Sequence, residues 1–330
     1  MLTDLFGRAI NYLRISLTDR CNLRCAYCMP AKGVDWLPRT QSLSSDEILR
    51  VVRAAARLGI SKIRLTGGEP LVYPEILSLV REIAASPSIS DLSLTTNATL
   101  LENLAEPLAR AGLKRVNISL DTLDPGKFKR ITRFGDFSRA WNGILAAEAA
   151  GLAPIKLNTV VVKGINDDEL EPLAQLTLEH PWHLRFIELM PIGNTADWGA
   201  GFPAEPQRYL SVQQMRSTLS TLNLQPDIAP IGNGPARTFR IPGARGTVGF
   251  ISPLGEHFCQ TCNRLRLTAD GQLRACLFKT GEVDLRFALR ESQPLEPLIQ
   301  ESVRRKPAGH ELWLLDTGVE SNRLMSQIGG

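Results

Sequence analysis

The chain has 330 residues, enough for one large domain and a smaller one to build their own cores. Its hydrophobic content of 43% and charged content of 22% are typical of a soluble globular protein, and a net charge of +4 is too small to indicate nucleic acid binding. Asp4 lies where a secretory signal would be basic, and no apolar run is long enough to span a bilayer. We therefore expect a cytoplasmic protein without a membrane or nucleic acid partner.

From residue 11 to about residue 222, short strand-like segments alternate with amphipathic helical segments. We predict strands at residues 13–17, 62–66, 92–96, 115–120, 155–162 and 184–189, and helices at residues 46–58, 74–85, 101–111, 137–150, 168–178 and 212–222. Ser44 and Glu47 have the spacing of a capping box before the first helix, and Gly59 follows its end. Six successive βα units predict a parallel sheet with right-handed crossovers, too few to close an eight-unit barrel. The expected fold is therefore α/β, a partial (β/α)6 barrel of the open TIM type.

Polar and apolar residues alternate along five of these strands. In the first strand, Arg14 and Ser16 face one way, opposite to Leu13, Ile15 and Leu17. The apolar face should pack against the helices, which leaves the polar face to line the inside, where an ordinary barrel carries branched aliphatic side chains. We expect a polar lumen that can hold charged ligands. The alternative, that these are solvent-facing edge positions, would have to hold for all five strands together.

The character of the sequence changes after residue 225. Residues 226–235 are rich in Pro, Gly and Asn, as in a linker or irregular loop. Short strands are predicted at residues 237–241, 247–251, 264–268 and 272–275, the last two joined through the hairpin signal Ala269-Asp270-Gly271, and two helices should follow. We therefore expect a barrel domain over residues 1–222 and a smaller α+β domain over residues 223–330 that caps the open barrel.

The six cysteines fall into two triplets with none left over: Cys21, Cys25 and Cys28, and then Cys259, Cys262 and Cys276. Thiols stay reduced in the cytoplasm, so metal ligation is favoured over the alternative of disulfides. Neither triplet contains the fourth ligand of a closed structural metal site. Three thiolates around a metal with one open position indicate binding and reaction.

The first triplet, Cys21-x3-Cys25-x2-Cys28, follows the first strand, on the barrel face where such folds place their chemistry. This spacing lets one loop hold three corners of an iron–sulfur cubane and leaves one iron for the amine and carboxylate of an amino acid. With Tyr27 before the last cysteine, the loop resembles the signature of the radical S-adenosylmethionine (SAM) enzymes. Chance or a zinc site is the alternative.

Other segments resemble the SAM-binding positions of the same superfamily. Thr66-Gly67-Gly68-Glu69-Pro70 ends the second strand and resembles the GGE segment that holds the amino end of SAM, although alone it would be read equally well as a tight turn. Ser119 and Met190, at the ends of the fourth and sixth strands, match positions that contact the same cofactor. Taken singly, each would be read as a packing residue.

Five cations indicate an anionic substrate: Arg14, Arg64, Lys156, Arg264 and Arg266. A lone strand arginine is usually paired with a carboxylate, but the predicted lumen face has few acids. Arginine forks and a lysine point charge would suit a polyphosphate. No glycine loop of the P-loop type is present.

The second triplet lies beside two of these arginines, in the stretch Cys259-Gln-Thr-Cys262-Asn-Arg264-Leu-Arg266, with Cys276 beyond it. It could be a zinc knuckle completed by a histidine, His257 being adjacent, or a closed auxiliary cluster. We favour a cluster with an open iron that binds substrate through a nucleobase nitrogen.

Taken together, these motifs closely resemble the family of GTP 3',8-cyclases, which begin molybdenum cofactor biosynthesis. The resemblance runs nearly end to end, through residues 14–21, 64–70, 94–97, 117–121, 156–158 and 188–191, the Cys259 region and the terminal Gly-Gly. Two cysteine triplets with Asn-Arg-x-Arg after the second separate this family from other radical SAM enzymes. Ala98, where glycine is common, and Leu189, where an aromatic is common, remove no ligand or cation.

The resemblance implies two [4Fe–4S] clusters, one on each triplet, and SAM as cofactor. The first cluster would deliver an electron to SAM and cleave it, and the 5'-deoxyadenosyl radical would remove hydrogen from C3' of GTP. The C3' radical would attack guanine C8 and then be reduced, giving 3',8-cyclo-7,8-dihydro-GTP. It assigns SAM contacts to Tyr27, Gly68, Ser119 and Met190, and GTP contacts to Arg14, Arg64, Thr95, Lys156, Arg264, Leu265 and Arg266, with no catalytic side chain beyond the cluster ligands.

The implied partners are a low-potential electron donor of the flavodoxin or ferredoxin type, a cyclic pyranopterin monophosphate synthase that takes the product, and a second copy of the chain in a homodimer. The Gly329-Gly330 tail is small enough to thread toward the site, and we assign it no role. Two alternatives stay open: a radical SAM enzyme that modifies peptides with an auxiliary cluster, and a zinc-stabilised binding module, for example for RNA.

Overall fold

The computed structural model describes residues 2–192, 198–199, 201–204, 207–228, 234–256, 258–310 and 323–329. Within these ranges, no helix combines the length and the apolar character that crossing a membrane requires. All the strands belong to a single sheet, whose order is β12-β11-β10-β1-β2-β3-β4-β5-β6-β9-β8-β7.

The strands are β1 (Tyr12–Ser16), β2 (Lys62–Thr66), β3 (Asp91–Thr96), β4 (Arg115–Ser119), β5 (Lys156–Val161), β6 (His183–Glu188), β7 (Gln225–Pro226), β8 (Arg237–Arg240), β9 (Thr247–Ile251), β10 (Arg264–Leu267), β11 (Gln272–Arg274) and β12 (Glu282–Asp284). The helices are α1 (Ser45–Arg57), α2 (Ile76–Ala84), α3 (Ala105–Arg110), α4 (Pro125–Thr132), α5 (Phe137–Ala149), α6 (Leu170–Glu179), α7 (Val212–Thr218), α8 (Arg286–Arg290) and α9 (Glu296–Arg304).

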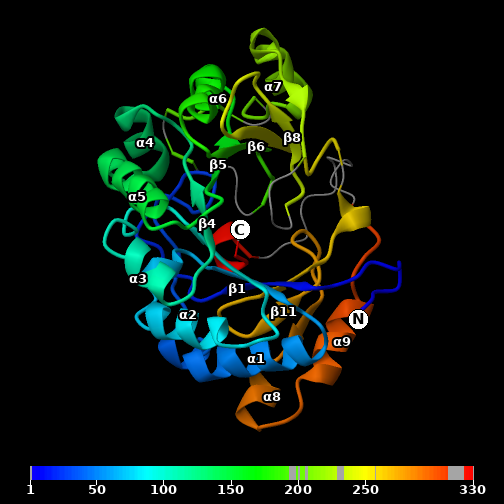
Figure 1. Cartoon of the computed structure of the whole chain (residues 1–330). Helices are drawn as coiled ribbons and strands as arrows, with labels where there is room; N and C mark the ends of the chain where they lie inside the picture. The colour runs from blue at the N-terminus through cyan, green and yellow to red at the C-terminus, as the bar shows by residue number, and fades with distance from the viewer. Residues whose placement is uncertain are drawn as a thin grey trace.

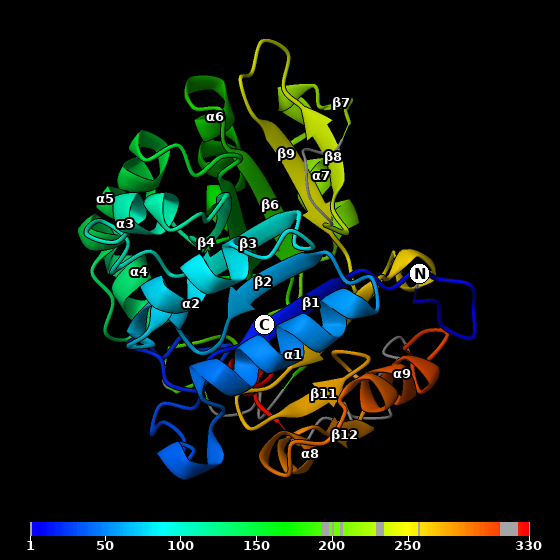
Figure 2. The ribbon, with the colours of Figure 1, turned by 60° about the horizontal axis from the view of Figure 1, so that its bottom comes forward.

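Strands β1 to β6 are parallel and lie in chain order, which confirms the predicted partial barrel. They curve around a lumen, and helices α1 to α6 cover the outside (Figures 1 and 2). The apolar residues of the strands face those helices: Leu13 and Ile15 of β1 belong to the same buried core as Ile48 and Val52 of α1. The period-two pattern of the strands therefore separates a helix-facing core from a polar interior, as predicted.

The capping box predicted for α1 is present. The Glu47 amide donates to Ser44 Oγ at 3.2 Å, and the Ser44 amide donates to Glu47 Oε2 at 2.8 Å. Sequence patterns missed α4, a short helix whose start is nevertheless marked by Pro125 in its first turn and by Asp124, which accepts from the Lys127 amide at 2.7 Å. The helix expected at 101–111 was predicted too long, because residues before 105 form turns.

The C-terminal part of the chain extends the sheet at both edges. Strand β9 pairs in parallel with β6, and β10 pairs in parallel with β1, placing Arg266 beside Arg14. The hairpin predicted between β10 and β11 is confirmed by their antiparallel pairing. Helix α9 packs on β12, β11 and α1, and Arg57 Nε lies 2.5 Å from Glu296 Oε1. The second cysteine triplet is thereby brought to the edge of the lumen; the boundary expected at residues 222 and 223 stays a prediction.

The end of the chain returns into the barrel, where the C-terminal label lies inside the ring of strands (Figure 1). Arg323 pairs with Asp270 at 2.9 Å and with Glu282 at 2.7 Å, so this segment is anchored to the β10–β12 region. Farther along, the Gly329 carbonyl accepts from Arg266 at 2.7 Å. A Cβ on Gly329 would lie 2.7 Å from Thr66 Cγ2, so the tail passes where a larger residue would clash. Gly330 lies outside the described residues.

Candidate active site between two cysteine loops

The first triplet lies in the loop that leaves β1, and this loop is held from α4. The guanidinium of Arg133, which follows α4 at φ +65°, donates to the carbonyls of Arg24 at 2.6 Å and Met29 at 2.9 Å. It also donates to the carbonyl of Trp198 at 2.9 Å. One half-buried cation therefore organises the backbone on both sides of Cys25 and Cys28.

The three thiols of the first loop are buried, which disfavours their deprotonation to thiolates. Burial raises the pKa of Cys21 to about 11 and that of Cys28 to about 12, and it raises the pKa of Cys25 well above its usual range, with the negative charge of Asp121 adding to the effect. A coordinated metal reverses this preference, because it deprotonates a ligating thiol outright. The three thiols lie close enough that Cys21 and Cys28 act on the pKa of Cys25, and all three line one cavity, which suits the iron–sulfur group that their spacing predicts.

Two buried carboxylates stand next to these thiols. The Tyr27 hydroxyl donates to Asp121 Oδ2 at 2.6 Å, while Asp121 Oδ1 accepts from the Val160 amide at 2.9 Å. Burial raises the pKa of Asp121 to about 6. A carboxylate that is buried without a cationic partner favours a positively charged ligand in the space beside it.

The second carboxylate, Glu69, belongs to the GGE turn. It accepts from the Thr96 hydroxyl at 2.7 Å and from the Asn97 amide at 2.8 Å, and burial raises its pKa to about 7. Gly68 is required here because a Cβ would lie 2.2 Å from the Arg20 carbonyl of the first cysteine loop. The glycines therefore let the turn and the cysteine loop pack backbone to backbone, with Glu69 between them.

The second triplet is held from the N-terminal arm. Arg8 donates to the Cys259 carbonyl at 2.7 Å and to the Pro307 carbonyl at 2.6 Å, and its Nε lies 2.5 Å from Asp4 Oδ2 in a buried ion pair. Burial raises the pKa of Cys262, but the charges of Lys306 and Arg264 outweigh it and lower this pKa to about 7. Burial raises the pKa of Cys259 in the same loop, so the thiolate is favoured at Cys262 specifically, in contrast to the thiols of the first loop. His257, the alternative zinc ligand, lies outside the described residues.

Arginines gather beside the second triplet because neighbouring strands are in register. In the strand register, Arg14 of β1 lies beside Arg266 of β10 on one side and beside Arg64 of β2 on the other. Burial lowers the pKa of Arg14 well below its usual range, and the nearby charges of Arg266, Arg64 and Arg264 add to this. Like charges that are buried together in this way favour an anionic ligand.

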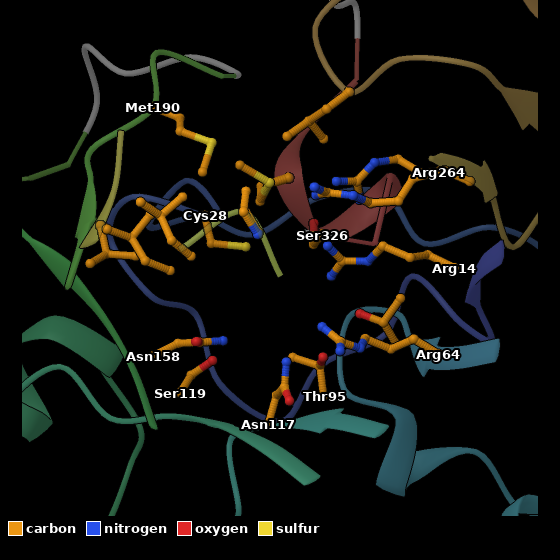
Figure 3. A pocket seen from close by; sticks show the side chains of 18 of the residues that line it. Arg14, Cys28, Arg64, Thr95, Asn117, Ser119, Asn158, Met190, Arg264 and Ser326 are labelled. Carbon is orange, nitrogen blue, oxygen red and sulfur yellow. The ribbon is translucent and has the colours of Figure 1, made fainter. Parts of the chain in front are cut away.

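Both cysteine triplets open into one cavity. Of the residues predicted to bind SAM or GTP, most line this cavity with the six cysteines: Arg14, Tyr27, Arg64, Gly68, Thr95, Ser119, Met190, Arg264 and Arg266. Figure 3 shows Arg14, Arg64 and Arg264 on one side, across the cavity from Cys28 and Met190. Segments separated by more than 200 residues thus share one site.

Two predicted residues lie elsewhere. Leu265 is fully buried in the hydrophobic core, so only its backbone could contact a ligand. Lys156 is 3% exposed and is not among the cavity-lining residues; burial lowers its pKa to about 6, helped by the charges of Arg185 and Arg115. Both assignments stay predictions.

Arg185 of β6 lines the cavity and was missed by the sequence analysis. With its amide turned so that oxygen faces the guanidinium groups, Asn117 accepts from Arg64 at 2.6 Å and from Arg185 at 3.0 Å. A signal was present, since Arg185 alternates with the core residues Leu184 and Phe186 as the polar residues of the other strands do. Extending the period-two rule to the sixth strand would have found it.

Several buried polar atoms at this cavity have no hydrogen-bond partner in the part of the chain that the structure describes. They are Thr95 Oγ1, Asn158 Oδ1, Arg185 Nε and Arg264 Nε. Such atoms are rare in folded proteins unless a ligand or water satisfies them. The cavity is therefore suited to a polar, multiply hydrogen-bonded ligand.

Comparisons with known proteins agree with this site. Residues 15–177 match the radical SAM superfamily, and residues 182–312 match the family described as Molybdenum Cofactor Synthesis C. GTP 3',8-cyclases of Moorella thermoacetica and Pelotomaculum thermopropionicum are 51% and 49% identical to the chain, each over 100% of both sequences.

A solved structure of Streptococcus suis SuiB bound to S-adenosylmethionine is similar in fold, with a TM-score of 0.61 at 15% identity, over 88% of this chain and 68% of that one. At this identity the likeness concerns the fold alone. The full-length relatives, about half identical to the chain, show the family: the chain belongs to the GTP 3',8-cyclases and is an enzyme of the radical SAM type.

Proposed function

We propose that the chain converts GTP into 3',8-cyclo-7,8-dihydro-GTP, the first step of molybdenum cofactor biosynthesis. The observation that carries this proposal is the polarity of the cavity shared by the two cysteine triplets, which has carboxylates beside one triplet and arginines beside the other. SAM is a cation at its sulfonium and ammonium groups, and GTP is a polyanion. A cavity with opposite charges at its two ends can hold both and keep them in a fixed relative orientation.

At the acidic end, Cys21, Cys25 and Cys28 hold a [4Fe–4S] cluster, and SAM lies beside Glu69 and Asp121. Gly68 leaves room for the cofactor backbone, and Tyr27, Ser119 and Met190 line the space around it. Bound there, the cluster and SAM supply a carbon-centred radical able to remove hydrogen from C3' of the substrate.

At the basic end, Arg14, Arg64, Arg264 and Arg266 bind the triphosphate, and Arg185 extends this set. Thr95 Oγ1 is a buried hydroxyl without a partner among the described residues, and it is available to the substrate. Lys156 lies behind the lining residues with its pKa lowered to about 6, and a polyphosphate bound nearby would favour its charged form. The side chain of Leu265 is buried in the core, so Leu265 contacts the substrate through its backbone peptide group, which lies beside Arg264 and Arg266.

The second triplet holds a second [4Fe–4S] cluster. Cys259, Cys262 and Cys276 line the cavity beside the arginines, and three thiolates leave one coordination position for the guanine. Binding the base and the phosphates at once fixes the ribose, and position decides which hydrogen a reactive primary radical removes. Residues 325–328 of the tail lie against the cavity and help to keep water out.

The same function requires partners and a reducing setting. A flavodoxin or ferredoxin type of donor supplies low-potential electrons, and a cyclic pyranopterin monophosphate synthase takes the product. The enzyme works in the cytoplasm, where its six free cysteines stay reduced, as a homodimer of chains that each consist of a barrel domain (residues 1–222) and a C-terminal domain (residues 223–330).

The test is anaerobic. The reconstituted protein is assayed for iron and sulfide, then incubated with dithionite, SAM and GTP carrying deuterium at C3', with ATP labelled at the same carbon as the control substrate. We expect two [4Fe–4S] clusters per chain and deuterium in 5'-deoxyadenosine from GTP only. SAM cleavage without transfer of the label would retain the radical class and refute the substrate.

A further inference from the structure

Lys306 lies just beyond α9 and is buried against the second cysteine loop, with 3% of its surface exposed. Its ammonium donates to the Ala275 carbonyl at 2.7 Å and to the Arg264 carbonyl at 2.9 Å. It also lies 3.4 Å from Cys262 Sγ, a normal distance for a nitrogen–sulfur hydrogen bond. Three donor hydrogens thus have three partners.

These three partners belong to both parts of the triplet. Arg264 is the first residue of β10 and Cys262 precedes that strand by two residues, while Ala275 and Cys276 follow β11. Lys306 therefore connects the Cys259–Cys262 pair to the third cysteine, which the chain separates by thirteen residues. The connection comes from a segment that contributes no cysteine.

The charge of Lys306 requires a separate explanation. Burying an ammonium is costly unless an anion lies close to it. Among the described residues Lys306 forms no ion pair with a carboxylate, and its ammonium is within hydrogen-bond distance of Cys262 Sγ and of the carbonyl oxygens of Arg264 and Ala275. Arg8 is a second cation near Lys306, and its charge is compensated by its own ion pair with Asp4. The group nearest to the ammonium that can carry a compensating negative charge is therefore Cys262 Sγ, at 3.4 Å.

We propose that Lys306 is a positioning residue for the second metal centre: it holds the two parts of the triplet together and supplies a buried positive charge beside its sulfurs. The proposal rests on the second [4Fe–4S] cluster of the proposed function. Positive charge and hydrogen bonds to the sulfurs stabilise the reduced, more negative state of such a cluster. Lys306 should therefore raise the reduction potential of this cluster as well as its occupancy.

The test isolates the second cluster in the full-length chain. The parent is the variant Cys21→Ala/Cys25→Ala/Cys28→Ala, reconstituted anaerobically with iron and sulfide. Lys306→Met removes the charge and the donors, Lys306→Arg keeps both, and Arg305→Met is the matched control, since Arg305 points to solvent and pairs with Glu301. The readouts are iron and sulfide per chain, circular dichroism for folding, and the reduction potential followed by electron paramagnetic resonance with dithionite as reductant.

We expect Lys306→Met to lower the equilibrium constant for reduction at least tenfold, which corresponds to about 59 mV for one electron. Lys306→Arg and Arg305→Met should stay close to the parent. If Lys306→Met binds no cluster while folded, retention of the cluster by Lys306→Arg supports the proposal. A potential and an iron content equal to those of the parent would overturn it. A folded parent that takes up no iron would overturn the second cluster itself, which is a distinguishable result.

Discussion

Around the first cysteine triplet, burial and the nearby carboxylates raise the pKa values of the thiols, whereas around the second the charges of Lys306 and Arg264 lower the pKa of Cys262. The scaffolds of the two loops are alike. In each, a guanidinium from elsewhere in the chain donates to loop carbonyls, Arg133 for the first and Arg8 for the second. Similar ligand sets are thus held in similar ways, and the surrounding charge distinguishes their roles.

The difference teaches that cysteine spacing alone does not decide what a cluster site binds. A cationic cofactor is favoured beside Glu69 and Asp121, and an anionic substrate is favoured beside the arginines. Variants that damage the acidic end or the basic end of the cavity separately, or that weaken the contacts holding one cysteine loop, test this difference.

The largest effect should come from removing a ligand at each end. Cys25→Ala should reduce SAM cleavage to the level without enzyme, because the first cluster is lost. Cys262→Ala should retain SAM cleavage and lose cyclisation, because only the substrate end is damaged. Separate assays of 5'-deoxyadenosine and cyclised product check this. Equal loss of SAM cleavage in both variants would show that the two ends do not act separately.

Arg266→Ala should impair the substrate end alone. Losing a charge-assisted hydrogen bond to a phosphate costs about 2–3 kcal/mol, or roughly 30- to 150-fold in kcat/KM for GTP. SAM cleavage should remain, since Arg266 lies with the other arginines. Arg110→Ala, on an exposed arginine with a 70% accessible side chain, serves as the control. Loss of the first cluster in Arg266→Ala would contradict the assigned role.

The acidic end should show a pH dependence. Because the pKa of Glu69 is raised to about 7, it becomes neutral as the pH falls through that value and no longer attracts a cation. Affinity for SAM should therefore fall by about tenfold in all as the pH is lowered through about 7, and level off once Glu69 is neutral. Calorimetric titration of SAM without GTP measures this.

Glu69→Gln sharpens the same test. It should bind SAM about tenfold more weakly at pH 8, a difference of about 1.4 kcal/mol. Any remaining pH dependence should then lie near pH 6, where Asp121 titrates. Glu106→Gln, on the surface, is the matched control. An unchanged pH profile in Glu69→Gln would remove Glu69 from the SAM site.

The least direct effects should come from the two guanidiniums that hold the loops. Arg133→Ala should lower the free energy of unfolding by about 1–2 kcal/mol through lost hydrogen bonds to carbonyls. Arg8→Ala should lower it by about 3–5 kcal/mol, because it also leaves the buried Asp4 without its partner. Iron should be lost selectively, from the first loop in Arg133→Ala and from the second in Arg8→Ala. Thermal unfolding and iron counts, each in a background without the other triplet, check the selectivity. Iron loss from both loops in either variant would argue against separate supports.

Much of the fold was predictable because its signals are local and periodic. The six βα units, the capping box at Ser44 and Glu47, and the hairpin around Asp270 each depend on residues within a few positions of one another. Helix α4 was missed because eight residues carry little periodicity, although its capping residues were readable. The cysteine spacing and the polar strand faces likewise pointed to the chemistry of the cavity.

By itself, the sequence determined the two cysteine triplets, the polar lumen and the order of the barrel strands. Only the tertiary structure decided which distant groups meet: Tyr27 with Asp121, Arg8 with Cys259, Lys306 with Cys262 and Arg266 with Gly329. The last three pairs are 251, 44 and 63 residues apart in the chain. The physical reason is that charge and hydrogen-bond partners in a buried site are set by which strands and loops pack together, and no local pattern records that choice.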